Sequence, residues 1–251
     1  MKKRIREKGF VAGTWCEIPS SYSVNAAAKA GMNFVIIDME HGVMNFETAQ
    51  EMVFAAQCES CSAFIRVPKL EESFILRALD TGADGIVIPH VEGIEDIKKI
   101  VEYSKFPPAG KRGFNPFIRA GNYGGAGRDF LKEQNKKVMT AVILEGAAAF
   151  ENIEKLASAE HIDIYYIGQY DLSAALGCPG DIWNKKVMDM LKKAAAVINK
   201  NGKLAGCMVH DIRGAVEMKK AGIKFIVKGT DTGILCAEYR KFADEFGGID
   251  K

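Results

Sequence analysis

Six ionisable side chains lie at or just after the ends of short apolar segments in this chain of 251 residues. They are Asp38, Glu40, His41, Arg66, Glu145 and Asp171. If the apolar segments are parallel strands, their carboxyl ends meet at one edge and bring these side chains together. Two carboxylates such as Glu145 and Asp171 are the oxygen ligands that a hard divalent cation prefers, with positions left for water and substrate oxygens. These residue types predict a metal-assisted active site.

Each of these residues also has a purely structural explanation. Asp38 can cap a turn, Arg66 can pair with a carboxylate, and His41 can be a satisfied loop histidine. Asp38 and Glu40 are two residues apart, which places both on one side of an extended strand. Their joint position at one rim favours the functional interpretation. Cys58 and Cys61 form a lone CxxC, which we interpret as two thiols at a helix end, and neither a redox motif nor a zinc site.

The elements that would position these residues follow a regular rhythm. Apolar segments cover residues 11–18, 34–38, 63–67, 85–89, 140–145, 162–167, 204–209 and 224–228. Helical patterns follow them at 21–30, 46–58, 72–79, 94–103, 148–157, 187–199, 212–220 and 234–246. Continuous apolar strands are typical of a parallel sheet that is buried on both faces. Eight such units predict a single (β/α)₈ barrel domain over 1–251. The alternative is an open doubly wound sheet, but the Gly-x-Gly-x-x-Gly motif typical of that fold does not follow the first apolar segment.

The segment 107–127 interrupts the rhythm. It is rich in proline and glycine and precedes a short helical pattern at 128–137. We interpret it as a flap over the mouth of the barrel, because long loops in barrels often carry function. A plain connector remains an alternative. A phosphate cradle also remains open, although the usual fixed spacing of glycine and lysine is missing.

Composition excludes several classes of protein. Lys+Arg number 34 against 32 Asp+Glu, so the net charge of +2 gives no basic face for nucleic acid. A hydrophobic content of 48% is typical of a globular domain, not a disordered chain. The basic N-terminus lacks the apolar core of a signal peptide, and no apolar run approaches the length of a membrane span. The six cysteines are scattered along the chain, and we expect them to be reduced thiols. We therefore expect a soluble cytoplasmic protein.

Five longer motifs connect the candidate residues, at 35–42, 64–68, 79–89, 107–113 and 167–173. Together, and in this order, they resemble the motifs of the HpcH/HpaI aldolase family. The resemblance implies a metal-dependent (class II) aldolase, an aldehyde-lyase that cleaves a 4-hydroxy-2-oxo acid to pyruvate and an aldehyde. It implies Mg²⁺ or Mn²⁺, with Co²⁺ or Zn²⁺ as further candidates, held by Glu145 and Asp171. It also implies a homo-hexamer, a trimer of dimers, in which subunits exchange their C-terminal helices.

The resemblance also implies roles for single residues. Arg66 would stabilise the keto oxygen of pyruvate, and His41 would be the base. Asp80 would orient that base, from the same or an adjacent subunit. Glu40 would orient water at the metal. The substrate would be bound by Arg66 together with Gly168, Gln169 and Asp38.

Two departures from the family pattern affect the substrate pocket. Ile143 replaces a polar residue that usually precedes the metal-binding glutamate, and Gln169-Tyr170 replaces the usual proline and its neighbour. We expect Gln169 to restore the lost amide from the next strand, while the sequence leaves the acceptor aldehyde undetermined. Three alternatives remain: a Schiff-base aldolase using Lys228, an acyl-CoA lyase of the citrate-lyase-β type, and a catalytically silent barrel that binds a 2-oxo acid.

Overall fold

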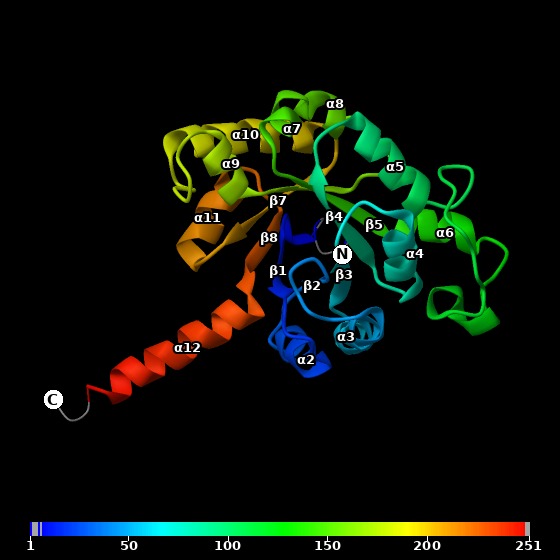
Figure 1. The fold of residues 1–251 in the computed structure, drawn as a ribbon, viewed down its shortest axis with the longest axis horizontal. Coiled ribbons are helices and arrows are strands. Elements are labelled where there is room, and N and C mark those ends of the chain that lie inside the picture. Colours follow the sequence, from blue (N-terminus) through cyan, green and yellow to red (C-terminus); the bar gives the residue numbers. More distant parts are fainter. Residues whose placement is uncertain (2–4, 6, 249–251) are drawn as a thin grey trace.

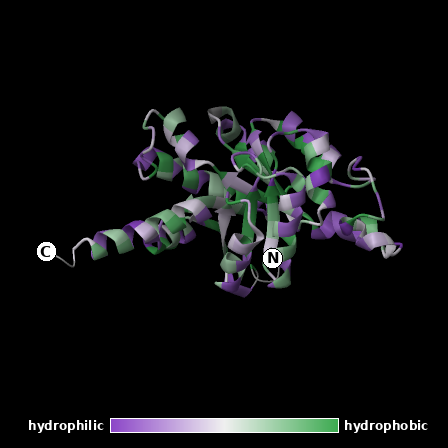
Figure 2. Ribbon diagram, turned by 60° about the horizontal axis from the view of Figure 1, so that its bottom comes forward, coloured by the Kyte–Doolittle hydropathy of each residue, from purple (hydrophilic) through white to green (hydrophobic). Residues whose placement is uncertain are grey.

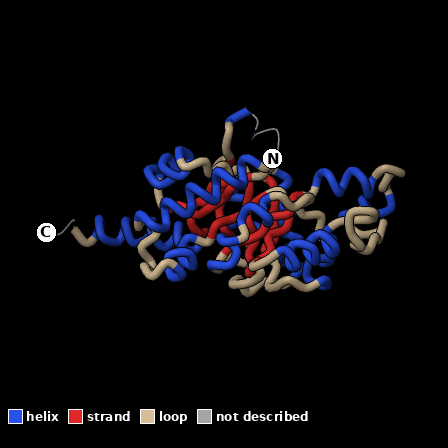
Figure 3. The backbone as a smooth tube through the Cα atoms, turned by 90° about the horizontal axis from the view of Figure 1, so that it is seen from above, coloured by secondary structure: helices blue, strands red, loops and turns tan. Residues whose placement is uncertain are grey.

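The barrel predicted from the apolar rhythm is confirmed. The computed structural model describes residues 1, 5 and 7–248, and in that part of the chain eight parallel strands close in sequence order (Figures 1 and 3). The strands are β1 (Val11–Cys16), β2 (Phe34–Asp38), β3 (Ser62–Arg66), β4 (Gly85–Val91), β5 (Met139–Leu144), β6 (Ile164–Ile167), β7 (Leu204–Val209) and β8 (Phe225–Thr230). β8 pairs with β1 and closes the ring.

Inward-pointing side chains fill the barrel. Near its amino-terminal end, Phe34 stacks on Phe225 with ring centroids 3.9 Å apart, and Phe64 meets Phe225 edge-on at 5.7 Å. Gly13 leaves room for this cluster, because a Cβ at that position would lie 2.4 Å from the Phe34 side chain. This end is therefore a packed core, which leaves the opposite end of the barrel for a cavity.

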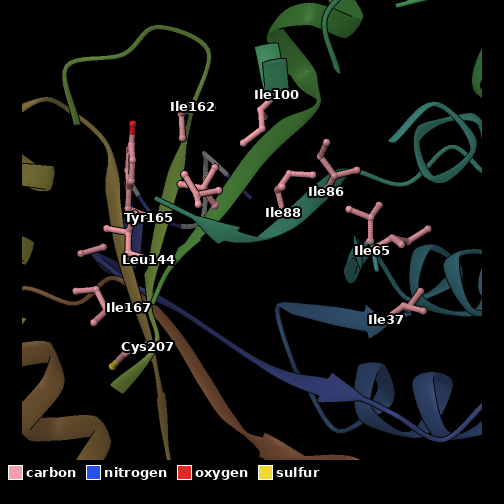
Figure 4. Packing of buried hydrophobic residues seen from close by; sticks show 14 of the residues in the cluster. Ile37, Ile65, Ile86, Ile88, Ile100, Leu144, Ile162, Tyr165, Ile167 and Cys207 are labelled. Carbon is pink, nitrogen blue, oxygen red and sulfur yellow. The ribbon is translucent and has the colours of Figure 1, made fainter. Parts of the chain in front are cut away.

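A ring of helices covers the outside of the strands. It comprises α2 (Ser21–Lys29), α3 (Phe46–Cys58), α4 (Glu72–Asp80), α5 (Ile94–Ser104), α6 (Phe130–Lys137), α7 (Ala147–Glu151), α8 (Ile153–Ala157), α9 (Gln169–Ala175), α10 (Lys185–Lys200) and α11 (Ile212–Lys220). Outward-pointing residues of the strands, such as Ile37, Ile65 and Leu144, pack beneath these helices (Figure 4). α10 buries Val187, Leu191 and other residues on one face, as its helical spacing predicts.

Three local details differ from the predicted elements. The predicted helix at 148–157 is two short helices, α7 and α8, separated at Asn152. α9 directly follows β6, and a 3₁₀ helix, η1 (Arg119–Gly124), lies in the 107–127 segment; the apolar pattern indicated neither. Both lie within loops of the predicted barrel, so they leave its topology unchanged.

The segment 107–127 lies at the amino-terminal end of the barrel, away from the mouth of its own chain. Arg112 pairs with Asp80 at the end of α4, and Arg119 donates to the Thr81 carbonyl at 2.6 Å. The reason is topological, because the segment joins the end of a helix to the start of β5, and such connections lie opposite the βα loops. As a flap it can only serve the mouth of another subunit, and that remains a prediction.

α12 (Asp231–Phe246) projects away from the barrel instead of packing on it (Figures 1 and 2). Asp231 is its buried residue. Tyr239, Phe242 and Phe246 are exposed, and the rings of the two phenylalanines stack on each other. The helix therefore presents apolar side chains that its own barrel does not cover.

No helix in the described part of the chain is long and apolar enough to cross a membrane. The prediction that the N-terminus is not a signal peptide rests partly on residues 2–4 and 6, which lie outside the described residues.

Candidate active site

A cavity of about 270 Å³ opens at the carboxyl ends of the strands, the mouth of the barrel. Polar side chains predicted from the sequence line it, namely His41, Arg66, Glu145 and Asp171. They come from β3, from the loops that follow β2 and β5, and from α9, the helix that follows β6. The structure therefore brings residues from distant parts of the chain to one cavity.

Arg66 is held rigidly at the edge of this cavity. Its Nε donates to Asp38 Oδ1 at 2.9 Å, its Nη2 contacts Asp38 Oδ2, and its Nη1 lies 2.9 Å from Glu40 Oε2. The guanidinium also lies over the Trp15 ring, 4.4 Å from its centroid. Two carboxylates and a ring thus set the direction in which the remaining N–H groups of Arg66 point.

Asp38 lies behind Arg66 and does not line the cavity surface. It is fully buried, and its Oδ1 also accepts from the backbone N–H groups of Glu40 and His41 at 3.0 and 3.2 Å. Both its oxygens are therefore engaged within the protein. This placement does not fit the predicted contact between Asp38 and substrate, and it makes Asp38 a residue that positions Arg66.

Glu145 and Asp171 converge across Gly168. A Cβ on Gly168 would lie 3.3 Å from both Asp171 Oδ2 and Glu145 Cγ, so glycine leaves space between β5 and β6. Burial raises the pKa of Glu145; His90 opposes this rise, while Asp171 and Glu40 add to it. Carboxylates that are partly dehydrated and close to each other attract a cation. Their chemistry fits a divalent metal ion.

These two carboxylates do not complete a coordination shell alone. Among the described residues, no group of three or more His, Cys, Asp or Glu side chains is arranged to hold a metal. Mg²⁺ and Mn²⁺ commonly bind through one or two carboxylates, with water and substrate oxygens as the other ligands. The assignment of Glu145 and Asp171 as the two protein ligands of a metal stays a prediction.

His90 is a residue of this region that the sequence analysis missed. Its Nε2 lies 2.8 Å from Glu40 Oε1, and its Nδ1 contacts Glu145 Oε2. Its backbone adopts a positive φ of 55°, where the register between β4 and β5 shifts. Partial burial opposes the imidazolium, but Glu145 and Glu40 outweigh it and raise the pKa of His90. The available signal was a polar residue directly after Pro89, at a strand end like the others.

The side chain of His41 is exposed at the entrance of the cavity. Its backbone N–H is held by Asp38, while its imidazole has no hydrogen-bond partner in the part of the chain that the structure describes. Glu40, by contrast, lies between Arg66 and His90 with its side chain only 10% exposed. His41 is thus accessible to a substrate, and Glu40 links Arg66 to the region around Glu145.

Asp80 does not join this site within one chain. It is the last residue of α4, and its Oδ1 accepts from Arg112 Nη2 at 2.9 Å. With Arg119 and Tyr123 it lines a separate cavity at the amino-terminal end of the barrel. The proposed pairing with His41 therefore requires a second subunit.

The residues that depart from the family pattern lie in or beside the cavity. Gln169 is buried and lines the cavity, and its amide nitrogen lies 4.0 Å from Met218 Sδ. The Tyr170 hydroxyl lies 2.8 Å from His210 Nε2 at the rim. Lys228 donates to the His210 carbonyl at 2.6 Å. Gln169 and Ile143 line the same cavity, and the predicted replacement of the lost amide by Gln169 stays a prediction.

Comparisons with known proteins agree with this arrangement. Residues 12–237 match the family described as HpcH/HpaI aldolase/citrate lyase. The chain is 30% identical over 237 residues to a hydroxypyruvate/pyruvate aldolase of Paraburkholderia phytofirmans, covering 92% of this chain and 91% of that protein. It is 31% identical over 252 residues to a 4-hydroxy-2-oxovalerate aldolase of Rhodococcus jostii, covering 99% and 96%.

A solved structure gives the same result. The fold is similar to that of an HpcH/HpaI aldolase/citrate lyase family protein from Burkholderia cenocepacia, with a TM-score of 0.91 at 28% identity over 98% of each chain. Sequence and fold agree over nearly the whole length, and the chain belongs to the HpcH/HpaI aldolase/citrate lyase family.

Proposed function

We propose that this protein is a divalent-metal-dependent aldolase that cleaves a 4-hydroxy-2-oxo acid to pyruvate and an aldehyde. The observation that carries the proposal is that Arg66, held by two carboxylates, faces the same cavity as Glu145 and Asp171. Two relatives, named as a hydroxypyruvate/pyruvate aldolase and a 4-hydroxy-2-oxovalerate aldolase, support the reaction class.

Glu145 and Asp171 would hold the metal, with Mg²⁺ or Mn²⁺ preferred and Co²⁺ or Zn²⁺ as alternatives. When bound, the metal supplies Lewis-acid stabilisation of negative charge on the 2-oxo group. Gly168 has no side chain between Glu145 and Asp171, which leaves space there for an ion. Glu40, which contacts both Arg66 and His90, orients water beside this site.

The remaining steps belong to side chains of this protein. His41 takes the proton of the C4 hydroxyl, and the C3–C4 bond breaks as the C4 oxygen becomes the aldehyde carbonyl. The electron pair of that bond forms the enolate of pyruvate, whose negative oxygen Arg66 stabilises. His41 then gives up the proton that it took, and transfer of a proton to C3, directly or through water, completes pyruvate and restores the base. Asp38 acts by fixing the guanidinium of Arg66, and Asp80 of a neighbouring subunit orients His41.

A homo-hexamer, built as a trimer of dimers that exchange α12, is the assembly we propose. α12 leaves its own barrel and exposes Tyr239, Phe242 and Phe246, an apolar surface that a second copy can bury. Light scattering should give the mass of a hexamer, and a monodisperse monomer would contradict this assembly.

We place the protein in the cytoplasm. Within the described residues none of the six cysteines forms a disulfide, and Cys16, Cys61 and Cys207 are buried, which suits a reducing compartment. Fractionation of the native host would test this placement.

The test of the reaction is pyruvate release from a set of 4-hydroxy-2-oxo acids, followed by coupled reduction of pyruvate. Excess chelator should abolish release, and Mg²⁺ or Mn²⁺ should restore it. Borohydride added with substrate should leave the protein unmodified, because Lys228 is not expected to form a Schiff base. Full activity in chelator, with pyruvate trapped on Lys228, would overturn the proposal. Binding of 2-oxo acids without turnover of any substrate would instead support a silent barrel.

A further inference from the structure

The base of the active-site cavity holds a tyrosine hydroxyl that none of the proposed steps uses. Tyr166 points inward from β6, lines the cavity and is 6% exposed. Its hydroxyl oxygen accepts the Nε1–H of Trp15 at 3.3 Å. Among the described residues no group accepts the proton of this hydroxyl. Tyr166 therefore has a hydrogen-bond donor left for a molecule in the cavity.

The same indole brings Tyr166 and Arg66 together. Arg66 lies over the face of the Trp15 ring at 4.4 Å, and the N–H of that ring reaches the Tyr166 hydroxyl. Trp15 comes from β1 and Tyr166 from β6, so the phenol reaches across the barrel beneath the mouth. A charged and a neutral donor thus flank one aromatic ring and line one cavity.

Several side chains around Tyr166 do not compete with it as donors, and the amide nitrogen of Gln169, which also lines the cavity, lies 4.0 Å from Met218 Sδ. Ile143, the β5 neighbour of Tyr166, is apolar, and Met208 has only a thioether. Trp15 has already committed its N–H to Tyr166. Burial raises the pKa of Tyr166, so the phenol stays protonated at any working pH. Tyr166 is consequently a neutral donor directly beside Ile143, where the family's usual polar group is missing.

We propose that Tyr166 is a further catalytic residue, whose O–H donates a hydrogen bond to the 2-oxo oxygen of the substrate and shares the negative charge of the enolate with Arg66. This inference rests on the aldolase function proposed above. A preorganised donor aimed at developing charge in a water-poor site stabilises the transition state more than the ground state.

The experiment uses Tyr166→Phe and a half-reaction that needs no aldehyde. The enzyme is loaded with Mg²⁺ and kept free of Mn²⁺, and ¹H NMR monitors the exchange of the pyruvate methyl protons for deuterium in D₂O. This exchange reports enolate formation alone. The exchange rate of the variant should fall about 10²-fold, which is the usual effect of losing one oxyanion donor. The pyruvate concentration that gives half of the maximal rate should change little. Oxalate, a planar mimic of the enolate, should bind more weakly to the variant by calorimetry.

Tyr165→Phe is the matched control. Tyr165 is the preceding residue of β6, but it points into the outer layer, where its hydroxyl donates to the Leu156 carbonyl (Figure 4). This variant should lose thermal stability and keep its exchange rate. Trp15→Phe, which removes the N–H accepted by Tyr166, should lose less exchange than Tyr166→Phe.

The outcomes separate the two proposals. If the native enzyme neither exchanges pyruvate protons nor releases pyruvate, the aldolase function fails, and the role of Tyr166 fails with it. If the native enzyme exchanges and a folded Tyr166→Phe enzyme exchanges at the same rate, only the role of Tyr166 is overturned. Equal losses in Tyr166→Phe and Trp15→Phe would show that Tyr166 acts through Trp15, which also overturns direct donation.

Discussion

The two ends of the barrel each hold an arginine–aspartate pair. At the mouth, Arg66 binds Asp38, which is fully buried; at the other end, Arg112 binds Asp80 at 2.9 Å. Each guanidinium also lies over an aromatic ring, at 4.4 Å and 4.5 Å. Both pairs thus combine a guanidinium, a carboxylate and a ring, although Arg66 contacts both oxygens of Asp38 and Arg112 contacts one oxygen of Asp80.

Their surroundings differ. Arg66 shares a cavity with Glu145 and Asp171, whereas the Arg112 side chain is only 3% exposed and ties the loop after α5 to the end of α4. An arginine held in place beside a cavity can stabilise charge on a ligand, and an arginine enclosed by protein stabilises the fold. Substitutions at the mouth should therefore cost activity, and substitutions at the other end should cost stability.

The largest effect is expected from the two carboxylates that distinguish the mouth. Glu145→Gln and Asp171→Asn should each lower kcat at least about a thousandfold, because several kcal/mol of metal stabilisation are lost. Calorimetry should show weaker Mn²⁺ binding by both variants, and circular dichroism an unchanged fold. Near-normal activity of either variant would remove that residue from the metal site.

His41 tests whether the two ends of the barrel meet between subunits. His41→Ala should lower kcat about 10²–10⁴-fold, the usual contribution of a general base. If Asp80 of a neighbour orients His41, Asp80→Asn should impair the same step, with non-additive effects in the double variant. Mixing the two single variants under subunit exchange should then restore part of the activity. Absence of recovery, with exchange demonstrated by mass spectrometry, would limit Asp80 to its contact with Arg112.

Arg66→Ala should reduce kcat about 10²–10³-fold, with a smaller change in KM, since its charge matters most as the enolate forms. Arg66→Lys should restore little, because an ammonium cannot reproduce the fork that Asp38 and Glu40 hold. Steady-state kinetics with metal at saturation measures both. A rise in KM with unchanged kcat would make Arg66 a binding residue only.

Arg112→Ala should instead lower the free energy of unfolding by about 3 kcal/mol. This is the lower end of the range for a broken buried ion pair, and we choose it because the Asp80 side chain is 27% exposed. Urea unfolding measures this change. Burial already raises the pKa of Asp80 despite Arg112, so the unpaired carboxyl has further reason to protonate. A loss of activity per folded molecule larger than that of Arg66→Ala would contradict the comparison of the two ends.

The smallest expected effect concerns pH and Glu145. Burial raises the pKa of Glu145, so the folded protein binds this proton more tightly than the unfolded chain does. Stability is therefore lost as pH rises through the folded pKa, and Glu145→Gln should avoid that loss. In chelator at neutral pH its Tm should exceed that of the native protein by about 2 °C, and the difference should vanish in acid. A lower Tm at neutral pH would mean that the His90 contact outweighs burial.

Much of the fold follows from local patterns. The segments of β2 and β7 are continuous apolar runs, and such runs form parallel strands wherever both faces are covered. Residues at the ends of those runs had to meet, because all carboxyl ends of a parallel barrel lie at one rim. For this reason Arg66, Glu145 and Asp171 were predictable as one group.

Other features were predictable in principle but were interpreted differently. The 107–127 segment joins a helix to a strand, so chain order alone places it at the amino-terminal end, although its glycines and prolines suggested a flap. His90 follows the fourth apolar segment as His41 follows the second. Its contact with Glu145 depends on a register shift and a positive φ, which no spacing rule indicates.

By itself, the sequence determined the order of strands and helices, the barrel, and which residues reach its mouth, because these depend on local burial patterns and parallel topology. Only the tertiary structure decided that Asp38 lies behind Arg66, that Gln169 faces Met218, and that Tyr166 reaches Trp15 across the barrel. Such contacts join strands or helices that are separated in sequence. Side-chain packing in the closed barrel selects them among many arrangements that the same pattern of elements permits.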